Sequence, residues 1–401
     1  MNKARIASRL SPLYKMTKTV GGDLQRIVGA IVPLLAAIAA FFCAAIILLF
    51  LGASPWEGFT ALVDGAFGDV NSLSQTAVRA TPLLLVGAGI SISFRASVIN
   101  IGGEGQIVAG ALLSTIVALQ FPDVPRPLLI PMVMLAGAIG GGIWGAIPGF
   151  LKAYAAVNEI LSTIMLNIVA VQFLNYMLRS PLIDPKEVEA GTRIPQTERL
   201  SDNAALPTLI DGTRLHLGVP IAIGAAAIAY VVLWRTPLGF RLRAVGHSPD
   251  AAKAAGIPVK RSIVAALAMS GAMCGLAGAI LVFGSEGQRL ITDGTSAGFT
   301  GSAGFNGIVA ALFGGLHPLW TIPSSFLFGG LLTGATSLQR ALQVPAAMAV
   351  ALNGIVVVFV VSSGRVRERL NQVVEARKEF ASATGTDEPS TDTESQAATT
   401  T

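Results

Sequence analysis

Two carboxylates and several amides lie in stretches of sequence that are otherwise apolar. Glu104 and Gln106 follow a pair of glycines, and Asn158, Glu159 and Asn167 belong to another apolar run. An ionisable group in hydrocarbon is costly unless it faces a helix-bundle interior or a wet cavity. Two interpretations therefore stay open. These side chains bind hydroxyls or ring nitrogens of a polar solute, or they form hydrogen bonds between helices that fix the fold.

Three further residues extend this candidate site. Asn100 precedes the glycine pair, and Phe305 and Asn306 lie in a later Gly-rich run. Phe305 either stacks on a flat ring or faces lipid or core. Only Glu104 and Glu159 qualify for an ion relay, and neither has a partner evident in the sequence.

The sequence offers no conventional catalytic or metal centre. It has two cysteines, both in apolar runs, and three histidines without metal-ligand spacing. No nucleophile–base pair is recognisable either. We therefore expect no catalytic residue, no metal site and no disulfide framework. The pair His317-Pro318 indicates a tight turn rather than a proton relay.

The composition excludes a water-soluble globule. The 401 residues are 52% hydrophobic and only 13% charged, whereas soluble domains carry about 25% charged residues. There are 44 glycines and only 6% aromatic residues, which suits helices packed backbone to backbone in lipid. Gly137, Gly141, Gly145 and Gly149 recur every fourth residue and predict one such close contact.

The apolar runs predict an all-α integral membrane protein with nine to eleven spans, ten being preferred. A spanning helix needs about 20 apolar residues. The first run is too long for a secretory signal, whose apolar core is about 7–15 residues. Runs 102–121 and 303–316 begin in Gly-rich sequence and are candidates for broken or re-entrant helices. The ten expected spans are 28–51, 76–94, 102–121, 128–151, 157–178, 218–235, 262–284, 303–316, 320–338 and 344–362.

Charge placement favours both termini in the cytoplasm, with the chain in the inner or plasma membrane. That orientation puts 19 of the 28 Lys and Arg residues inside, as short cytoplasmic loops require. The sequence then divides into a basic N-terminus (1–27), a transmembrane domain (28–364) and a cytoplasmic tail (365–401) whose polar part, from about 383, is predicted to be disordered. The domain includes an external loop (179–217) and a cytoplasmic loop (236–261).

The cytoplasmic loop encodes a short exposed helix within residues 238–258 (LGFRLRAVGHSPDAAKAAGIP). Ser248 can cap its start, Pro249 fits the first helical position and Asp250 complements the helix dipole. Ala251 to Ala255 continue the helix, and Gly256 followed by Pro258 ends it. Such a rigid surface helix between two spans can transmit a partner's motion to the membrane helices.

A weak internal repeat links the two Gly-rich runs. Residues 103–109 (GEGQIVA) and 304–310 (GFNGIVA) agree at four of seven positions. In the expected topology the first helix runs outward and the second inward, which is the arrangement of an inverted repeat around a solute path. Chance similarity in sequence rich in Gly, Ala and Val is the alternative.

Residues 238–258 resemble the coupling segment of permeases in ABC importers of the branched-chain amino acid, ribose and nucleoside type. Three further blocks resemble the nucleoside (simple sugar) branch: 94–106 (FRASVINIGGEGQ), 158–167 (NEILSTIMLN) and 304–315 (GFNGIVAALFGG). The resemblance covers roughly residues 28–370. This chain differs from the ribose branch, which has an Asp-Leu-Ser type sequence where this chain has residues 103–106.

The resemblance implies a type II ABC importer permease that moves nucleosides, with a simple sugar or a branched-chain amino acid as alternatives. It also implies partners: a cytoplasmic ATP-binding subunit, a second permease subunit in a heterodimer and an extracytoplasmic substrate-binding lipoprotein, but no nucleic acid. The chain has no phosphate-binding loop of the Gly-x4-Gly-Lys-Ser/Thr type, so we expect ATP and Mg²⁺ on the partner and no cofactor here. An ion-coupled secondary transporter remains the less favoured alternative. The resemblance assigns ATPase coupling to Arg241, Arg243, Ser248, Pro249, Asp250, Ala251, Ala255 and Gly256.

Overall fold

The computed structural model describes residues 38–39, 42–43, 45–50, 52–285, 287–343, 354–355 and 358. Residues 48–353 form one compact unit, and residues 1–47 with 354–401 form another. The first unit holds all the helices discussed below. The expected spans 28–51 and 344–362, the N-terminus 1–27 and the tail 365–401 lie largely or wholly outside the described residues.

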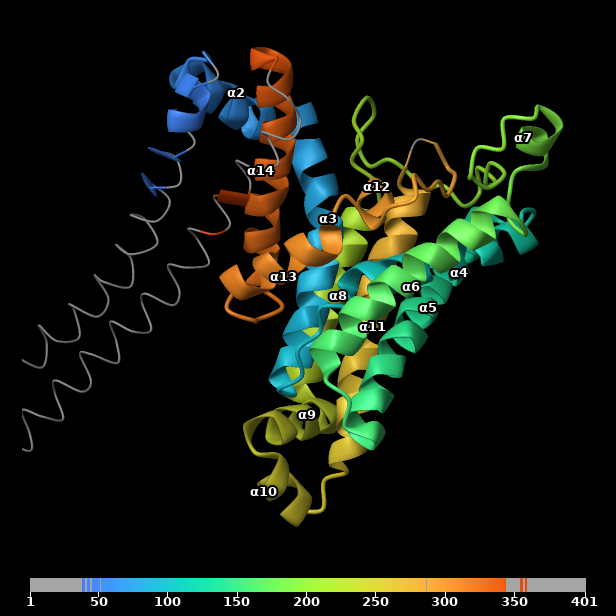
Figure 1. Cartoon of the computed structure of the whole chain (residues 1–401), viewed down its shortest axis with the longest axis vertical. Coiled ribbons are helices and arrows are strands. Elements are labelled where there is room, and N and C mark those ends of the chain that lie inside the picture. Colours follow the sequence, from blue (N-terminus) through green and yellow to red (C-terminus); the bar gives the residue numbers. More distant parts are fainter. Residues whose placement is uncertain are drawn as a thin grey trace, which may run out of the picture. The chain divides into compact units, whose positions relative to one another are not determined.

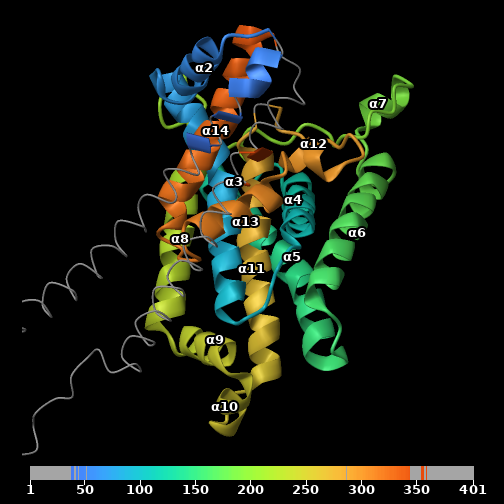
Figure 2. The same cartoon turned by 60° about the vertical axis from the view of Figure 1, so that its left-hand side comes forward.

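The described part of the chain is helical, and its only β pairings are the isolated bridges Gln196–Ile291 and Thr208–His216. Figures 1 and 2 show long helices lying side by side, with α9 and α10 at one end and α7 and α12 at the other. The helices are α2 (Pro55–Phe67), α3 (Val70–Arg95), α4 (Gly103–Gln120), α5 (Arg126–Ala155), α6 (Glu159–Arg179), α7 (Pro185–Glu189), α8 (Gly218–Arg235), α9 (Pro237–His247), α10 (Pro249–Ala254), α11 (Val259–Phe283), α12 (Ser296–Thr300), α13 (Ala303–Phe313) and α14 (Thr321–Leu342).

Five of the described helices, namely α3, α5, α6, α8 and α11, are long and apolar enough to cross a membrane. The apolar helix α13 has only 11 residues, which at 1.5 Å per residue gives about 16 Å. That length is roughly half of a hydrocarbon core of about 30 Å. Run 303–316, one of the ten expected spans and a candidate for a broken or re-entrant helix, therefore forms a helix too short to cross the hydrocarbon core alone.

Most expected spans coincide with helices, and the predicted span 218–235 has the bounds of α8. The sequence reading missed α2, α7, α9 and α12. In the cytoplasmic loop it predicted one helix, where the structure has two, α9 and α10. Four helices, α2, α7, α9 and α10, begin with a capping side chain followed by Pro, at Ser54, Asp184, Thr236 and Ser248. This signal was recognised only at Ser248.

The centre of the bundle is a contact between α5 and α11 in which backbone meets backbone. A Cβ atom added at Gly141 would lie 2.3 Å from the Gly271 carbonyl oxygen, and one added at Gly275 would lie 2.1 Å from the Gly137 oxygen. Gly145 meets the backbone of Leu267 and Gly271 in the same way. The glycine stripe is therefore a surface of close helix approach, as the spacing predicted.

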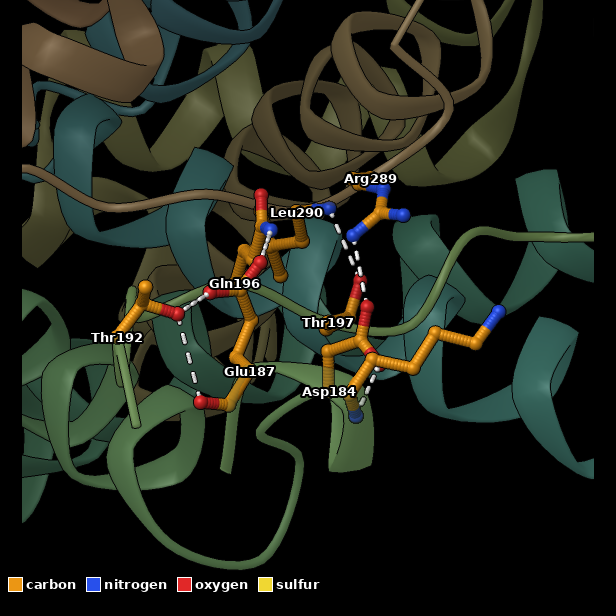
Figure 3. Close-up of polar contacts among 8 residues, drawn as sticks. Asp184, Glu187, Thr192, Gln196, Thr197, Arg289 and Leu290 are labelled. Carbon is orange, nitrogen blue, oxygen red and sulfur yellow. Dashed lines mark hydrogen bonds and ion pairs between the residues drawn. The ribbon is translucent and has the colours of Figure 1, made fainter. Parts of the chain in front are cut away.

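Polar contacts at the α7 end lie within residues 184–197 and also join this segment to Arg289 and Leu290 (Figure 3). The buried carboxylate of Asp184 accepts from Arg289 Nη1 at 2.8 Å. Glu187 accepts from Gln196 Nε2 at 2.8 Å and from the Thr192 hydroxyl. The Thr197 N–H donates to the Leu290 carbonyl oxygen at 3.0 Å, which is a further bond between the two segments. The end of α6 is thus joined to the chain that follows α11.

We expect Gly141→Ala to destabilise the protein by about 2 kcal/mol, because the new methyl group would overlap the α11 backbone and overpacking typically costs 1–3 kcal/mol. The measurement is the midpoint temperature of thermal unfolding of the purified protein in detergent.

Gly142→Ala is the matched control on the same helix. Its nearest atom would be the Ala268 carbonyl oxygen at 3.4 Å, an ordinary contact. Equal shifts for the two variants would contradict the assigned α5–α11 interface.

Candidate functional site

Helix α4 begins inside the bundle rather than at its surface. The chain leaves α3 at Arg95 and turns back inward before α4 starts (Figure 2). Asn100, in the returning segment, donates to Ser270 Oγ at 2.9 Å, midway along α11. Its Nδ2 also donates to Gln106 Oε1 at 3.0 Å, and its Oδ1 accepts from the Gly102 N–H at 2.9 Å. This amide group therefore fixes the entry of α4.

The start of α4 meets the start of α13. A Cβ atom at Gly304 would lie 2.4 Å from the Glu104 nitrogen, so the two chains pass in backbone contact. Glu104 Oε1 accepts from the Phe305 N–H at 3.2 Å, and Oε2 accepts from the Thr300 hydroxyl. Helix α13 has no side-chain cap of its own, since Ser302 is in the left-handed region at φ 61°. A carboxylate from α4 thus occupies the capping place of α13.

Asn167 supports α4 from helix α6. Its Oδ1 accepts from the Gly105 N–H at 2.8 Å, and its Nδ2 donates to the Ile101 oxygen at 3.0 Å. Helix α4 likewise has no capping side chain at its own N-cap residue, Gly102. Both helix starts are therefore satisfied by side chains from other elements.

The structure brings together only part of the predicted site. Asn100, Glu104, Gln106 and Asn167 form one buried cluster, each 7% exposed or less. Their hydrogen bonds are internal, which fits the fold-fixing alternative. Whether any of them contacts a solute stays a prediction.

Of the other predicted residues, Phe305 binds this cluster through its backbone N–H. Asn158 caps α6 by accepting from the Ile160 N–H at 2.9 Å. Glu159 pairs with Lys152 at 2.5 Å. Phe305 is 47% exposed and Asn306 is half-buried. Glu104 and Glu159, for which the sequence shows no evident partner, both bind groups from other helices, which sequence spacing does not reveal.

The predicted coupling helix is present as α10. Ser248 Oγ accepts from the Ala251 N–H at 3.3 Å, Pro249 begins the helix and Gly256 takes φ +77°. Ala252 is the one buried residue of α10. The preceding helix α9 contributes exposed Arg241 and half-buried Arg243, and Asp250, Ala251, Ala255 and Gly256 are exposed. The helix prediction is confirmed, and its role remains a proposal.

A cavity of about 490 Å³ opens at the opposite end of the bundle. It is lined by α3, α11, residues 205–216 and residues 284–288, and its polar members include Arg214, His216 and Gln288. Burial lowers the pKa of His216, whose Nδ1 accepts from the Gly218 N–H at 3.1 Å. No residue of the predicted path lines this cavity. It was missed because its polar groups come from loops without a recognisable motif.

The apolar helices, the glycine contacts and the internally satisfied polar cluster define a multi-pass membrane protein. Residues 72–361 match the family described as the branched-chain amino acid transport system permease component, and the chain belongs to that family.

Three relatives are similar over most of their length. The guanosine ABC transporter permease NupP of Bacillus subtilis is 34% identical, covering 86% of this chain and 96% of its own. The nucleoside ABC transporter permease NupB of Lactococcus lactis is 35% identical over 77% and 85%, and the glucose ABC transporter permease TsgB13 of Haloferax volcanii is 31% identical over 82% and 87%. No solved structure matches the chain.

We expect Glu104→Ala to lower the stability of the protein by about 2–3 kcal/mol, because it leaves the Phe305 N–H without its acceptor. Glu104→Gln keeps one carbonyl oxygen for that N–H, so its effect should be smaller. Thermal unfolding in detergent measures both.

Glu57→Ala is the control, since Glu57 is an exposed acid in the first turn of α2. The capping assignment fails if Glu104→Ala and Glu57→Ala shift the midpoint by the same amount.

Proposed function

We propose that this chain is the permease subunit of an ATP-driven importer that carries nucleosides. The observation that supports this most directly is the similarity to permeases named for guanosine and nucleosides over most of their length. The similarity to a permease named for glucose favours a simple sugar as the second candidate cargo.

We infer that the chain has ten spans arranged as two inverted halves. The packing supports this, since α3 lies against α13 and α14 while α11 lies against α4 and α5. Exchanging α3 with α11, α4 with α13 and α5 with α14 preserves these contacts. The two echo motifs, 103–109 and 304–310, begin at the exchanged helices α4 and α13.

We infer that α10 is the element moved by a cytoplasmic ATP-binding subunit. It is short, capped at both ends and exposed except for Ala252. A groove on a partner subunit can therefore bind it. The distribution of Lys and Arg favours a cytoplasmic location for this end and for both termini. A second permease, taken to be a different chain, and an extracytoplasmic binding lipoprotein complete the proposed complex in the bacterial plasma membrane.

In the proposed cycle, the lipoprotein delivers the solute at the α7 end. ATP binding by the partner then displaces α10, and the permease halves rock to open inward. The chain itself holds no ATP in this scheme, and the hydrolysis belongs to the partner subunit.

The test of the cargo is uptake by proteoliposomes that contain the permease, its genomic partner permease, ATPase and lipoprotein. We expect uptake of radiolabelled guanosine only with internal ATP, competed by unlabelled uridine but not by glucose. Competition by glucose alone would favour the sugar. Uptake by the single chain without ATP would contradict the proposal and favour an ion-coupled transporter.

Replacing residues 249–254 with a Gly/Ser linker should abolish co-purification of the ATPase subunit and lower uptake at least tenfold. The fold should survive, because only Ala252 of α10 is buried. The matched control replaces residues 185–189, the short helix α7 at the opposite end, and should leave the ATPase attached. If ATP-driven uptake is undiminished with the α10 linker, then an element other than α10 is moved by the ATP-binding subunit.

A further inference from the structure

The end of α3 and helix α9 are in direct backbone contact. A Cβ atom at Gly246 would lie 2.1 Å from the Arg95 carbonyl oxygen, so no larger residue fits there. The Ser97 hydroxyl donates to the Gly246 oxygen at 2.6 Å. Ser248 is both the last cap of α9 and the first cap of α10. A displacement of α10 therefore carries α9 and the end of α3 with it.

The Arg95 side chain reaches from this contact to the turn that follows α13. Its Nη2 donates to the Leu316 oxygen at 3.3 Å, and its guanidinium carbon lies 5.3 Å from the centroid of the Trp234 ring. Leu316 is in the left-handed region at φ 53°, where α13 has just ended. Arg95 thus joins three elements, the ends of α3 and α8 and the turn 314–317.

Aromatic contacts hold the same turn from the side of α8. The His317 ring lies 4.8 Å from Trp234 and 5.4 Å from Tyr230, centroid to centroid. Burial, together with the neighbouring Arg95, lowers the pKa of His317, which keeps a second positive charge away from Arg95. The turn is therefore clamped between a cation and two aromatic rings.

Polar side chains from other elements contact helix α13 at or near both of its ends. Glu104 contacts its first turn, and Arg95 contacts the turn just after its last residue. With 11 residues, a helix behaves as a rigid rod over this length. A shift of the turn 314–317 therefore changes the contact between Gly304 and Gly103, where the two short helices meet.

We propose that Arg95 is a positioning residue that transmits displacement of α9 and α10 through the turn 314–317 to α13. The proposal rests on the proposed function, in which α10 receives the push. The planar guanidinium suits the task because it can stack on Trp234 while it donates to a carbonyl.

The hydrogen bonding of Arg95 and His317 is also consistent with a contact that changes when the turn 314–317 moves. Within the described chain, Arg95 Nε and His317 Nδ1 are buried without a hydrogen-bond partner. Buried polar atoms without partners are rare and costly. Because two of them lie in one contact, an arrangement that gave them partners would gain hydrogen bonds.

The test compares Arg95→Ala and Arg95→Lys in the reconstituted complex, with labelled guanosine uptake and ATP hydrolysis measured on the same vesicles. Arg95→Ala should keep ATP hydrolysis within about twofold while guanosine transported per ATP falls at least tenfold. Arg95→Lys keeps the charge and a donor but not the planar stack. Its guanosine transported per ATP should lie between the values of Arg95→Ala and the parent protein. A purely structural role would lower uptake and hydrolysis together.

Lys260→Ala is the matched control. Lys260 makes a cation–π contact with Tyr154 at 5.1 Å at the same end of the bundle, away from the turn. It should leave guanosine per ATP within twofold of the parent. An unchanged ratio in Arg95→Ala, or a parallel fall of both rates, would overturn the role of Arg95. Absence of ATP-dependent uptake by the parent complex would instead overturn the proposed function.

A second measurement applies if Arg95→Ala does not fold. Ser97→Cys and His247→Cys are combined with Cys43→Ala and Cys274→Ala, and the pair is joined by a short reducible thiol cross-linker. Because α9 and the end of α3 move together in the proposal, the cross-linked complex should keep ATP-dependent uptake. Loss of uptake on cross-linking that is restored by reduction would show that these elements must slide, and would overturn the proposal.

Discussion

The fold depends on how the N–H groups of two helix starts are satisfied inside an apolar interior. Hydrocarbon offers no hydrogen-bond partner, so backbone polar groups at that depth need partners within the protein. Helices α4 and α13 both begin there, and neither N-cap residue supplies a side-chain acceptor. Glu104 serves α13 and Asn167 serves α4. Each short helix is therefore stable only when the elements around it are in place.

That dependence explains why the glycine contacts matter beyond packing. A carboxylate on α4 reaches the Phe305 N–H only because Gly103 and Gly304 let the two backbones touch. The α5–α11 contact positions α11, which presents Ser270 to Asn100. Small side chains thus set the distances over which the polar groups bind. The polar groups in turn make that arrangement preferable to others of similar packing.

The sequence predicts the apolar framework well and the polar partners poorly. Span 218–235 and the stripe beginning at Gly137 follow from local composition, which fixes burial and close approach. The partners of Glu104 lie 196 and 201 residues away in the chain, and no local spacing encodes such a pairing. Helices α2 and α9 carry charged residues, so a prediction based on long apolar runs does not include them. Their Ser-Pro and Thr-Pro starts were the available signal.

The two echo motifs contribute different chemical groups to the contact between α4 and α13. Glu104 corresponds to Phe305, so one motif contributes a carboxylate and the other a backbone N–H at the same place. An aromatic residue at position 104 would leave the Phe305 N–H at the start of α13 without its acceptor. Glu104 lies where two helix N-termini meet, and both positive dipole ends favour a carboxylate there, although Glu104 supplies the acceptor for α13 and Asn167 supplies the acceptor for α4. The carboxylate at position 104 thus stabilises the backbone contact in which the starts of α4 and α13 meet.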